Sequence, residues 1–138
     1  MIKPYKGTFH VEWFQKVAST AFAFNDLVYI DGNGYLTPAI DGANIKAVGL
    51  IQTTIAATDD DYASTTLVPV LVGDSNAEYL CDVSTGTAAT TDIGEHIDID
   101  DANSVDVAAS TYDVFFVTKV ISTTQIVATL NIKGGAAA

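Results

Sequence analysis

Acidic side chains are the most numerous potential metal ligands in the sequence, and they are densest in GEHIDIDDANSVDV, residues 94–107. Carboxylate oxygens are the ligands that Ca²⁺ and Mg²⁺ prefer in proteins. A calcium loop of the EF-hand type also needs a glycine at its sixth position and a glutamate at its twelfth. Counted from Asp98, those positions hold Asn103 and Ala109, so the segment lacks both the turn and the bidentate ligand.

The same segment alternates apolar and polar residues, which is typical of a strand with one wet face. We expect its isoleucines, Ile97 and Ile99, to point inward. Its polar side chains are expected to point into water: His96, Asp98 and Asp100. The pattern therefore predicts a solvated strand face, with an adventitious divalent-ion site over 92–106 as the alternative, and we predict neither a bound metal nor a cofactor.

Other residues that carry out catalysis are sparse. His10 and His96 form no H-x-H or H-x-x-x-H pair, so a zinc site lacks ligands. Cys81 is the single cysteine and is expected to be a small buried side chain on a strand. The chain has no P-loop, no complete dinucleotide fingerprint and no G-x-S-x-G sequence. We predict that the protein is not an enzyme.

Charge and hydropathy argue against two classes of partner. The six basic residues are all lysines, the acidic residues number 17, and the formal net charge is −11. Such a body repels phosphate backbones, so we expect no nucleic-acid partner. No apolar run reaches the 18 residues of a membrane span, and the start MIKPYKGTFH lacks the apolar run of a secretory signal. We therefore expect no membrane partner and synthesis in the cytoplasm.

β-Branched and aromatic residues are abundant and turn residues recur at short intervals, which predicts strands and little helix. The expected strands are 27–30, 35–37, 46–57, 67–72, 78–83 and a closing hairpin of 113–121 and 125–132. The fold is predicted to be all-β, as one compact antiparallel β-barrel or β-sandwich with an extended N-terminal arm. We divide it into an N-terminal arm or first strand at 1–20, a β-domain at 21–133 and a flexible tail at 134–138.

Several glycines and prolines refine these strands. Asp31-Gly32-Asn33-Gly34 predicts a tight hairpin turn of the primed type, in which glycine and asparagine accept positive φ. Gly49 is expected at a bulge or a close approach between backbones. Pro38 and Pro69 are expected near sheet edges, because proline cannot donate to a ladder.

The N-terminal segment differs from the rest of the chain. Residues 1–16 hold three lysines and one glutamate, together with four of the thirteen aromatic residues. The stretch TFHVEWFQKV alternates, so it is either a first core strand or an arm that pairs with a neighbouring chain. The residues expected to contact a partner are Lys3, Tyr5, Lys6, Phe9, His10, Trp13 and Phe14.

The order of these features resembles the small head decoration, or cement, proteins of tailed bacteriophages. Many of those carry a strand–turn–strand of the form G-D-x-V-x-x-x-x-x-G-x-x-x-P-A, followed by a strand with a central glycine. The residues of this chain that fit are Asp26, Val28, Gly34, Pro38, Ala39 and Gly49. Asn25 departs from the pattern, because a glycine usually stands there. The resemblance covers about residues 21–132.

The resemblance implies a β-tulip or β-barrel domain that forms a homotrimer on the outer surface of the expanded capsid. There it would bind the major capsid protein and clamp neighbouring subunits, with no reaction and no cofactor. The virion would be its final location. The alternatives are another virion module of a tail, spike or fibre and, as a third class, a secreted glycan-binding or calcium-binding module.

Overall fold

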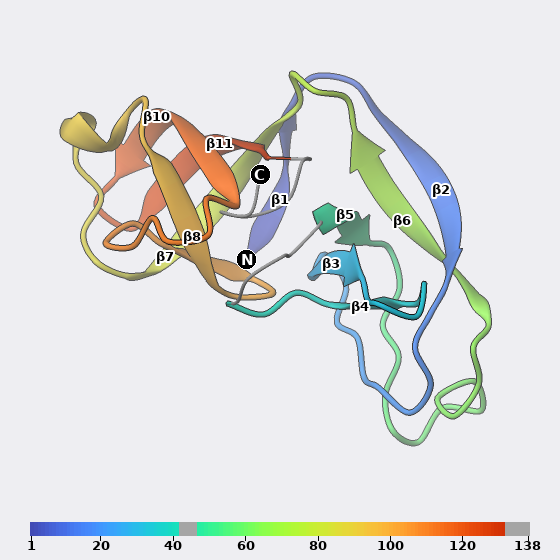
Figure 1. Cartoon of the computed structure of the whole chain (residues 1–138). Helices are drawn as coiled ribbons and strands as arrows, with labels where there is room; N and C mark the ends of the chain where they lie inside the picture. Colours follow the sequence, from blue (N-terminus) through green and yellow to red (C-terminus); the bar gives the residue numbers. More distant parts are fainter. Residues whose placement is uncertain (42–46, 132–138) are drawn as a thin grey trace.

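A computed structural model describes residues 1–41 and 47–131 (Figure 1). In these ranges the regular structure consists of strands and one short 3-10 helix, η1 (Thr90–Asp92). The strands form two sheets, which confirms the all-β prediction. Within the described ranges, no helix is long and apolar enough to cross a membrane. The predicted tail, 134–138, lies outside the described residues.

The first sheet closes into a barrel. Its order is β1 (Ile2–Lys6), β7 (Glu78–Thr85), β11 (Gln125–Leu130), β10 (Phe115–Ser122), β8 (His96–Asp101) and β9 (Ser104–Asp106). Pairing of β9 with β7, with Val83 opposite Val105, completes a ring of five strands, and β1 pairs with the other part of the same β7 edge. The other strand pairs of the described residues are antiparallel, as predicted. The closing pair differs from the prediction because it is parallel.

The second sheet curls but does not close completely. Its order is β2 (Phe9–Gln15), β6 (Leu67–Gly73), β5 (Ala47–Ile51), β3 (Leu27–Ile30) and β4 (Leu36–Pro38). Just beyond β2, Lys16 forms an isolated bridge with Leu36, and the Val17 amide donates to the Leu36 carbonyl at 2.8 Å. The two end strands of the sheet therefore meet at one point, and β2 is otherwise an edge strand.

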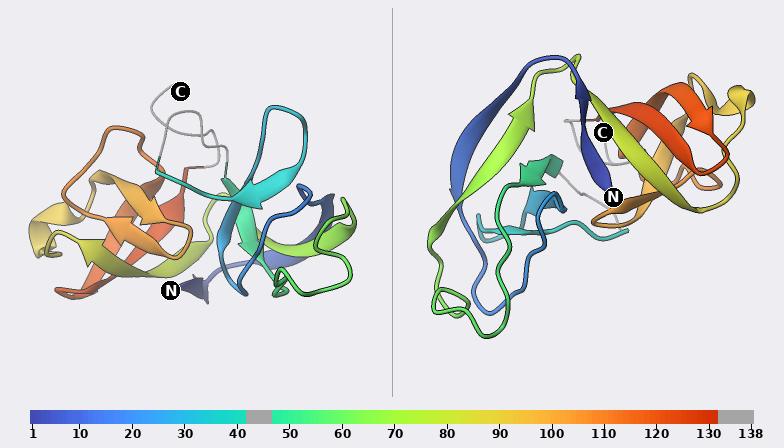
Figure 2. Two further views of the ribbon diagram at one scale, coloured as in Figure 1. Left: turned by 90° about the horizontal axis from the view of Figure 1, so that it is seen from below. Right: turned by 180° about the vertical axis from the view of Figure 1, so that it is seen from behind.

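The N-terminal segment belongs to both sheets. It runs as β1 in the barrel sheet and, after residues 7 and 8, as β2 in the second sheet, so that it crosses from one to the other (Figures 1 and 2). The extended N-terminal arm of the prediction is thus two hydrogen-bonded strands. A partner that contacts this segment therefore meets strand residues of two different sheets and not a flexible arm.

Two apolar cores hold the molecule together. The larger one fills the barrel, where Tyr79 contacts Phe9 and Phe115 edge-to-face at centroid distances of 5.5 and 5.9 Å. It also includes Leu27 and Leu50 of the second sheet, so the two sheets share this core and form one body. The smaller core lies on the opposite face of the second sheet, among the buried residues Phe22, Val28, Leu36, Ile51, Ile55, Val68 and Val70.

The turn between β3 and β4 differs from the predicted primed type. Among its residues only Gly34 has a positive φ, of 87°. The Asp31 carboxylate instead accepts the amides of Asn33 and Tyr35 at 2.8 and 2.9 Å. Because this side chain satisfies the amides of the turn, Gly32 and Asn33 keep the ordinary negative φ, and a glycine is needed at one position only.

Gly49 and the prolines mark local features of the second sheet. A Cβ on Gly49 would lie 2.2 Å from the Leu71 carbonyl oxygen, so the predicted close approach is confirmed. Pro38 ends the edge strand β4, also as predicted. The prediction that Pro69 lies near a sheet edge is wrong, because its strand β6 lies between β2 and β5. The ladder of β5 ends at Ile51, opposite Val70, so the missing N–H of Pro69 falls where that ladder stops.

Candidate functional site

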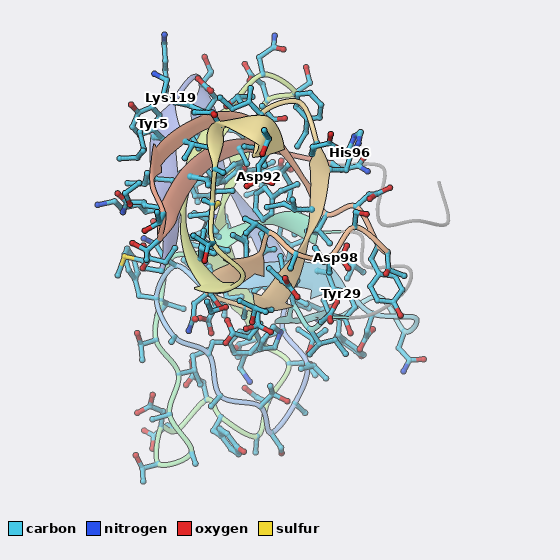
Figure 3. The ribbon with its side chains drawn as sticks, turned by 90° about the vertical axis from the view of Figure 1, so that its left-hand side faces the viewer. Tyr5, Tyr29, Asp92, His96, Asp98 and Lys119 are labelled. Atoms are coloured by element: carbon cyan, nitrogen blue, oxygen red, sulfur yellow. The ribbon has the colours of Figure 1, made fainter. Side chains whose placement is uncertain are left out.

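The acidic segment forms β8 and β9. For one of its carboxylates, Asp98, the prediction that it points into water is wrong. Asp98 is buried, with only 2% of its surface exposed. Its Oδ1 accepts the amides of Tyr112 and Asp113 at 2.7 and 2.9 Å, and its Oδ2 accepts the Thr111 amide at 3.1 Å. Through these hydrogen bonds Asp98, which is labelled in Figure 3, holds the loop between β9 and β10 against the barrel. The alternation of neighbouring residues carries no sign of this loop, which comes from later in the chain.

The other carboxylates of the segment bond to nearby hydroxyls and amides. Asp100 is exposed and accepts the hydroxyls of Ser84 and Thr85 at 2.6 and 2.9 Å, and these two hydrogen bonds lower its pKa below the usual value. Asp101 accepts the Asn103 amide and the Ser104 hydroxyl within a turn. Within the described ranges, no group of three or more His, Cys, Asp or Glu side chains has the arrangement of a metal site.

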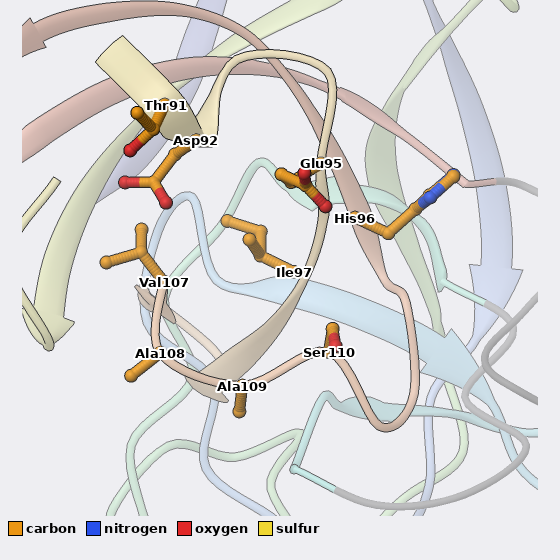
Figure 4. Close-up of a pocket in the computed structure, with 9 residues that line it drawn as sticks. All are labelled: Thr91, Asp92, Glu95, His96, Ile97, Val107, Ala108, Ala109 and Ser110. Carbon is orange, nitrogen blue, oxygen red and sulfur yellow. The ribbon is translucent and has the colours of Figure 1, made fainter. Parts of the chain in front are cut away.

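A cavity of about 250 Å³ opens between η1, the start of β8 and residues 107–110 (Figure 4). The carboxylates of Asp92 and Glu95 lie on its rim, and Asp92 also accepts the Ala89 amide at 2.8 Å. The His96 ring points away from the cavity and packs edge-on against Phe116, at a centroid distance of 5.1 Å. The cavity therefore does not bring the imidazole together with the carboxylates as an acid–base pair.

Cys81 is fully buried in the barrel core, as predicted. Burial in apolar surroundings raises the pKa of its thiol well above the usual value, chiefly because the thiolate would lose its hydration. A thiol in this environment stays protonated and packs as a small apolar side chain.

The predicted contact residues divide between the two sheets. Lys3, Tyr5 and Lys6 are exposed on β1 of the barrel sheet. On β2, His10 and Trp13 are exposed, whereas Phe9 and Phe14 are half-buried. The two phenylalanines pack against the barrel core and the second core, respectively, so they are primarily structural.

Exposed apolar side chains gather on one face of β2 and β6. Val11 pairs with Leu71, Trp13 with Pro69 and Gln15 with Leu67, and cross-strand partners share a face. Trp13 is 60% exposed, Leu67 59% and Val11 51%, so they are among the most exposed large apolar residues of the described chain. We call this patch the β2–β6 strip and define it by Val11, Trp13, Leu67, Pro69 and Leu71. The sequence indicated its β2 half. The apolar character of LVPVLV on both faces favours a strand that is covered on both sides, so the exposure of Leu67 was not predicted.

Among the described residues, no strand pairs with the outer edge of β2, so its backbone groups are unpaired there. The Asp74 amide donates to the Thr8 carbonyl, and the Lys16 amide donates to the Thr66 carbonyl. Hydrogen-bonded and non-bonded pairs alternate along an antiparallel ladder, so the even-numbered residues from 8 to 16 bond to β6. The N–H and C=O groups of the odd-numbered residues therefore point to the free edge. These residues are Phe9, Val11, Trp13 and Gln15.

A smaller hollow lies on the inner face of the same sheet. It has a volume of about 230 Å³, and its walls include Phe14, Val48 and Val72. Glu12 lies on its rim and its carboxylate is 2.7 Å from His10 Nε2. The free edge of β2 thus has an apolar strip on one side and a largely apolar hollow near the other.

Lys16 is a buried cation that the sequence did not single out. Its side chain is fully buried, and Nζ donates to the carbonyls of Tyr62 (2.9 Å) and Ser64. It therefore fastens the polar loop between β5 and β6 to the end of β2. Because it is buried, Lys16 adds nothing to the surface charge that residues 1–16 present to a partner.

Comparison with known proteins gave no family for the chain: no family model matches it, and no curated protein matches it.

Proposed function

We propose that the protein is a structural component of a phage virion, which binds the outer surface of the expanded capsid as a homotrimer and stabilises contacts between major capsid subunits. The observation that carries the proposal is the β2–β6 strip, which lies beside an unpaired strand edge on an otherwise strongly acidic body. A soluble monomer gains nothing from exposing a tryptophan among other apolar side chains, whereas a partner that covers them gains their burial.

The unpaired edge of β2 indicates how a capsid segment would bind. An extended capsid segment that pairs with the odd-numbered backbone groups of β2 would add a strand to the second sheet. Its alternate side chains would lie over Trp13 on one face and toward the hollow beside Phe14 on the other. Three such contacts from one trimer would reinforce one another, by about 10²–10⁴-fold where the geometry lets all three engage.

The resemblance to decoration proteins supports the proposal through one residue in particular. Asn25 stands where those proteins usually have a glycine, and its φ is 68°. Asparagine is among the few residues that tolerate this left-handed conformation, so the position has the backbone geometry that a glycine would provide. The departure from the pattern is thus conservative in conformation.

Co-sedimentation with purified expanded capsids tests the proposal. Deleting residues 1–16 would remove β1 and β2 from both sheets, so point substitutions are the sharper tool. Trp13→Ser and Val11→Ser together are expected to weaken capsid binding at least about tenfold, because the contact loses its central apolar anchor. Ile121→Ser, which alters a 47% exposed apolar residue on the barrel, is the matched control and should leave binding unchanged.

Two results would contradict the proposal. Unaltered binding by the Trp13 and Val11 double variant would exclude the β2–β6 strip as the contact. Failure of the unaltered protein to bind expanded capsids would exclude the function itself, and immuno-electron microscopy that labels tails would support the tail, spike or fibre alternative instead.

A further inference from the structure

The exposed lysines of the described chain all lie on one face of the barrel sheet. Lys3 and Lys6 are on β1 and Lys119 is on β10, whereas Lys16 is buried. Lys3 lies opposite Leu80, Leu80 opposite Val127, and Val127 opposite Lys119, so one row of side chains crosses four strands. The neighbours of Val127 along β11, Ile126 and Ala128, belong to the barrel core. The row therefore faces outward.

A contact between Tyr5 of β1 and Lys119 of β10 links the two strands that carry the exposed lysines. Lys119 Nζ lies 5.9 Å from the centre of the Tyr5 ring, a cation–π distance, and the two side chains project together from the outer wall (Figure 3). Val127 is fully buried although it faces outward, while Leu80 stays partly exposed. We call this surface the lysine wall and define it by Lys3, Tyr5, Lys6, Leu80, Lys119 and Val127.

The lysines of the wall form no ion pair among the described residues, although the charge of Lys3 helps to lower the pKa of the Asp82 carboxyl. In the part of the chain that the structure describes, the two ion pairs join the N-terminal amine to Asp82 and His10 to Glu12, and neither involves a lysine. Glu78, the cross-strand neighbour of Lys6, accepts the Thr118 hydroxyl at 2.7 Å. In a chain with 17 acidic residues, three exposed ammonium groups on one face thus remain available to the carboxylates of another molecule.

We propose that the lysine wall is a docking surface for an extended, carboxylate-bearing segment of another polypeptide. Two acidic side chains of this segment pair with Lys3 and Lys119, and an apolar side chain between them covers Leu80. The three strand spacings from β1 to β10 place the backbones of Lys3 and Lys119 about 14 Å apart, and four residues of an extended chain span about 13 Å. Acidic residues four positions apart, with the apolar residue midway, therefore fit the row.

The charge of the whole protein selects among anionic partners. Nucleic acid carries a dense row of phosphates that the surrounding acidic body repels, and the wall has no arginine to bind phosphate in a bidentate manner. A polypeptide with two separated carboxylates engages the wall while the rest of it stays neutral. The wall lies on the other sheet from the β2–β6 strip, so this interaction goes beyond the proposed capsid contact and its test needs no capsid.

The test is a titration of the ¹⁵N-labelled protein with the peptide acetyl-Gly-Glu-Gly-Leu-Gly-Glu-Gly-amide, followed by amide chemical shifts. Saturable shifts are expected along β1, β7 and β10. The same peptide with glutamine for both glutamates is expected to bind at least about tenfold more weakly, because the charge-assisted pairs are lost. A peptide with adjacent glutamates should also bind more weakly, and equal affinity would overturn the bridging of Lys3 and Lys119.

Two double variants distinguish the effect of the wall's lysines on peptide binding from the effect of the protein's net charge. Lys3→Gln with Lys119→Gln is expected to weaken peptide binding at least about tenfold, because both pairing partners are neutral. The matched control, Ala57→Glu with Ala63→Glu, lowers the net charge equally at exposed positions of the β5–β6 loop and should leave the affinity within about twofold. Three results would each overturn the proposal: no saturable shifts on the wall up to about 5 mM peptide, equal weakening by the control, or tighter binding of a single-stranded oligothymidine than of the acidic peptide.

Discussion

The barrel and the second sheet solve the problem of strand edges differently. In the barrel, the parallel pair of β7 and β9 closes the ring, so each of its five strands has neighbours on both sides. The second sheet curls toward closure but meets only at Lys16 and Leu36, which leaves the edge of β2 unpaired. A closed sheet satisfies its own backbone, whereas an open one carries hydrogen-bonding groups that another chain can use. The difference supports the proposal that a partner binds at β2, and it leads us to expect the greater stability in the barrel.

Each sheet also uses one buried charge to hold a loop. In the barrel, the Asp98 carboxylate accepts three backbone amides from the loop before β10. In the second sheet, the Lys16 ammonium donates to two backbone carbonyls of the loop before β6. An anion thus gathers amides in one region and a cation gathers carbonyls in the other. Asp98 satisfies three backbone groups and Lys16 satisfies two, so we expect removal of Asp98 to cost more free energy of unfolding.

Asp98→Ala should have the largest effect on stability. Three backbone amides lose a charged acceptor that is itself buried, and we expect the free energy of unfolding to fall by about 4 kcal/mol, given about 1–3 kcal/mol for each unsatisfied group with partial relaxation. Chemical denaturation followed by Trp13 fluorescence measures this. Asp100→Ala removes an exposed carboxylate two residues away and is the control, with an expected loss under about 1 kcal/mol. Equal losses would show that burial of Asp98 is unimportant.

Lys16→Met should have a smaller effect. The methionine retains most of the aliphatic stem and removes the ammonium group, so the carbonyls of Tyr62 and Ser64 lose their donor. We expect a loss of about 2 kcal/mol in the free energy of unfolding, with faster amide hydrogen exchange confined to the loop between β5 and β6. A loss as large as that of Asp98→Ala, or faster exchange throughout the barrel, would break the comparison of the two regions.

Ser84→Ala should have the smallest effect, at the seam where the barrel closes. The hydrogen bonds of Ser84 and Thr85 lower the pKa of Asp100 in the folded protein. The stabilisation from ionised Asp100 is therefore present above about pH 4, the value of an unperturbed aspartate, and is lost as the pH falls through the lowered pKa. Removing the Ser84 hydroxyl is expected to raise that pKa toward the usual value. Carboxyl NMR titration measures it, and Ser110→Ala is a control that should leave Asp100 unchanged.

Local patterns predicted the strands better than they predicted the way the sheets close. The hairpin of β10 and β11 followed from the period of two in Ile126, Ala128 and Leu130, all of which are buried. The close approach at Gly49 was also predictable, because a glycine inside an apolar strand commonly marks a bulge or a neighbouring backbone that comes unusually near. Parallel closure through Val83 and Val105 was not, since it joins distant segments and leaves no mark on either one.

The candidate surfaces were predictable to a similar extent. Alternation and aromatic content identified β2 and its exposed Trp13, but gave no register with β6, so Leu67 was missed. Alternation also placed Asp98 in water, because a period of two assumes that nothing covers the outer face of the strand. The lysine wall could not be predicted from the sequence, because Lys3 and Lys119 lie near opposite ends of the chain. Only the pairing of four strands places them in one row.

The two-residue link between β1 and β2 has a mechanical consequence. A pulling force applied at β2 is shared between the ladder with β6 and the main chain into β1, which lies antiparallel to β7 over Ile2 to Lys6. The component of this load along β1 shears the β1–β7 ladder, so that its hydrogen bonds resist together instead of opening one after another. A partner held at β2 would thus transfer tension into the most fully closed part of the molecule.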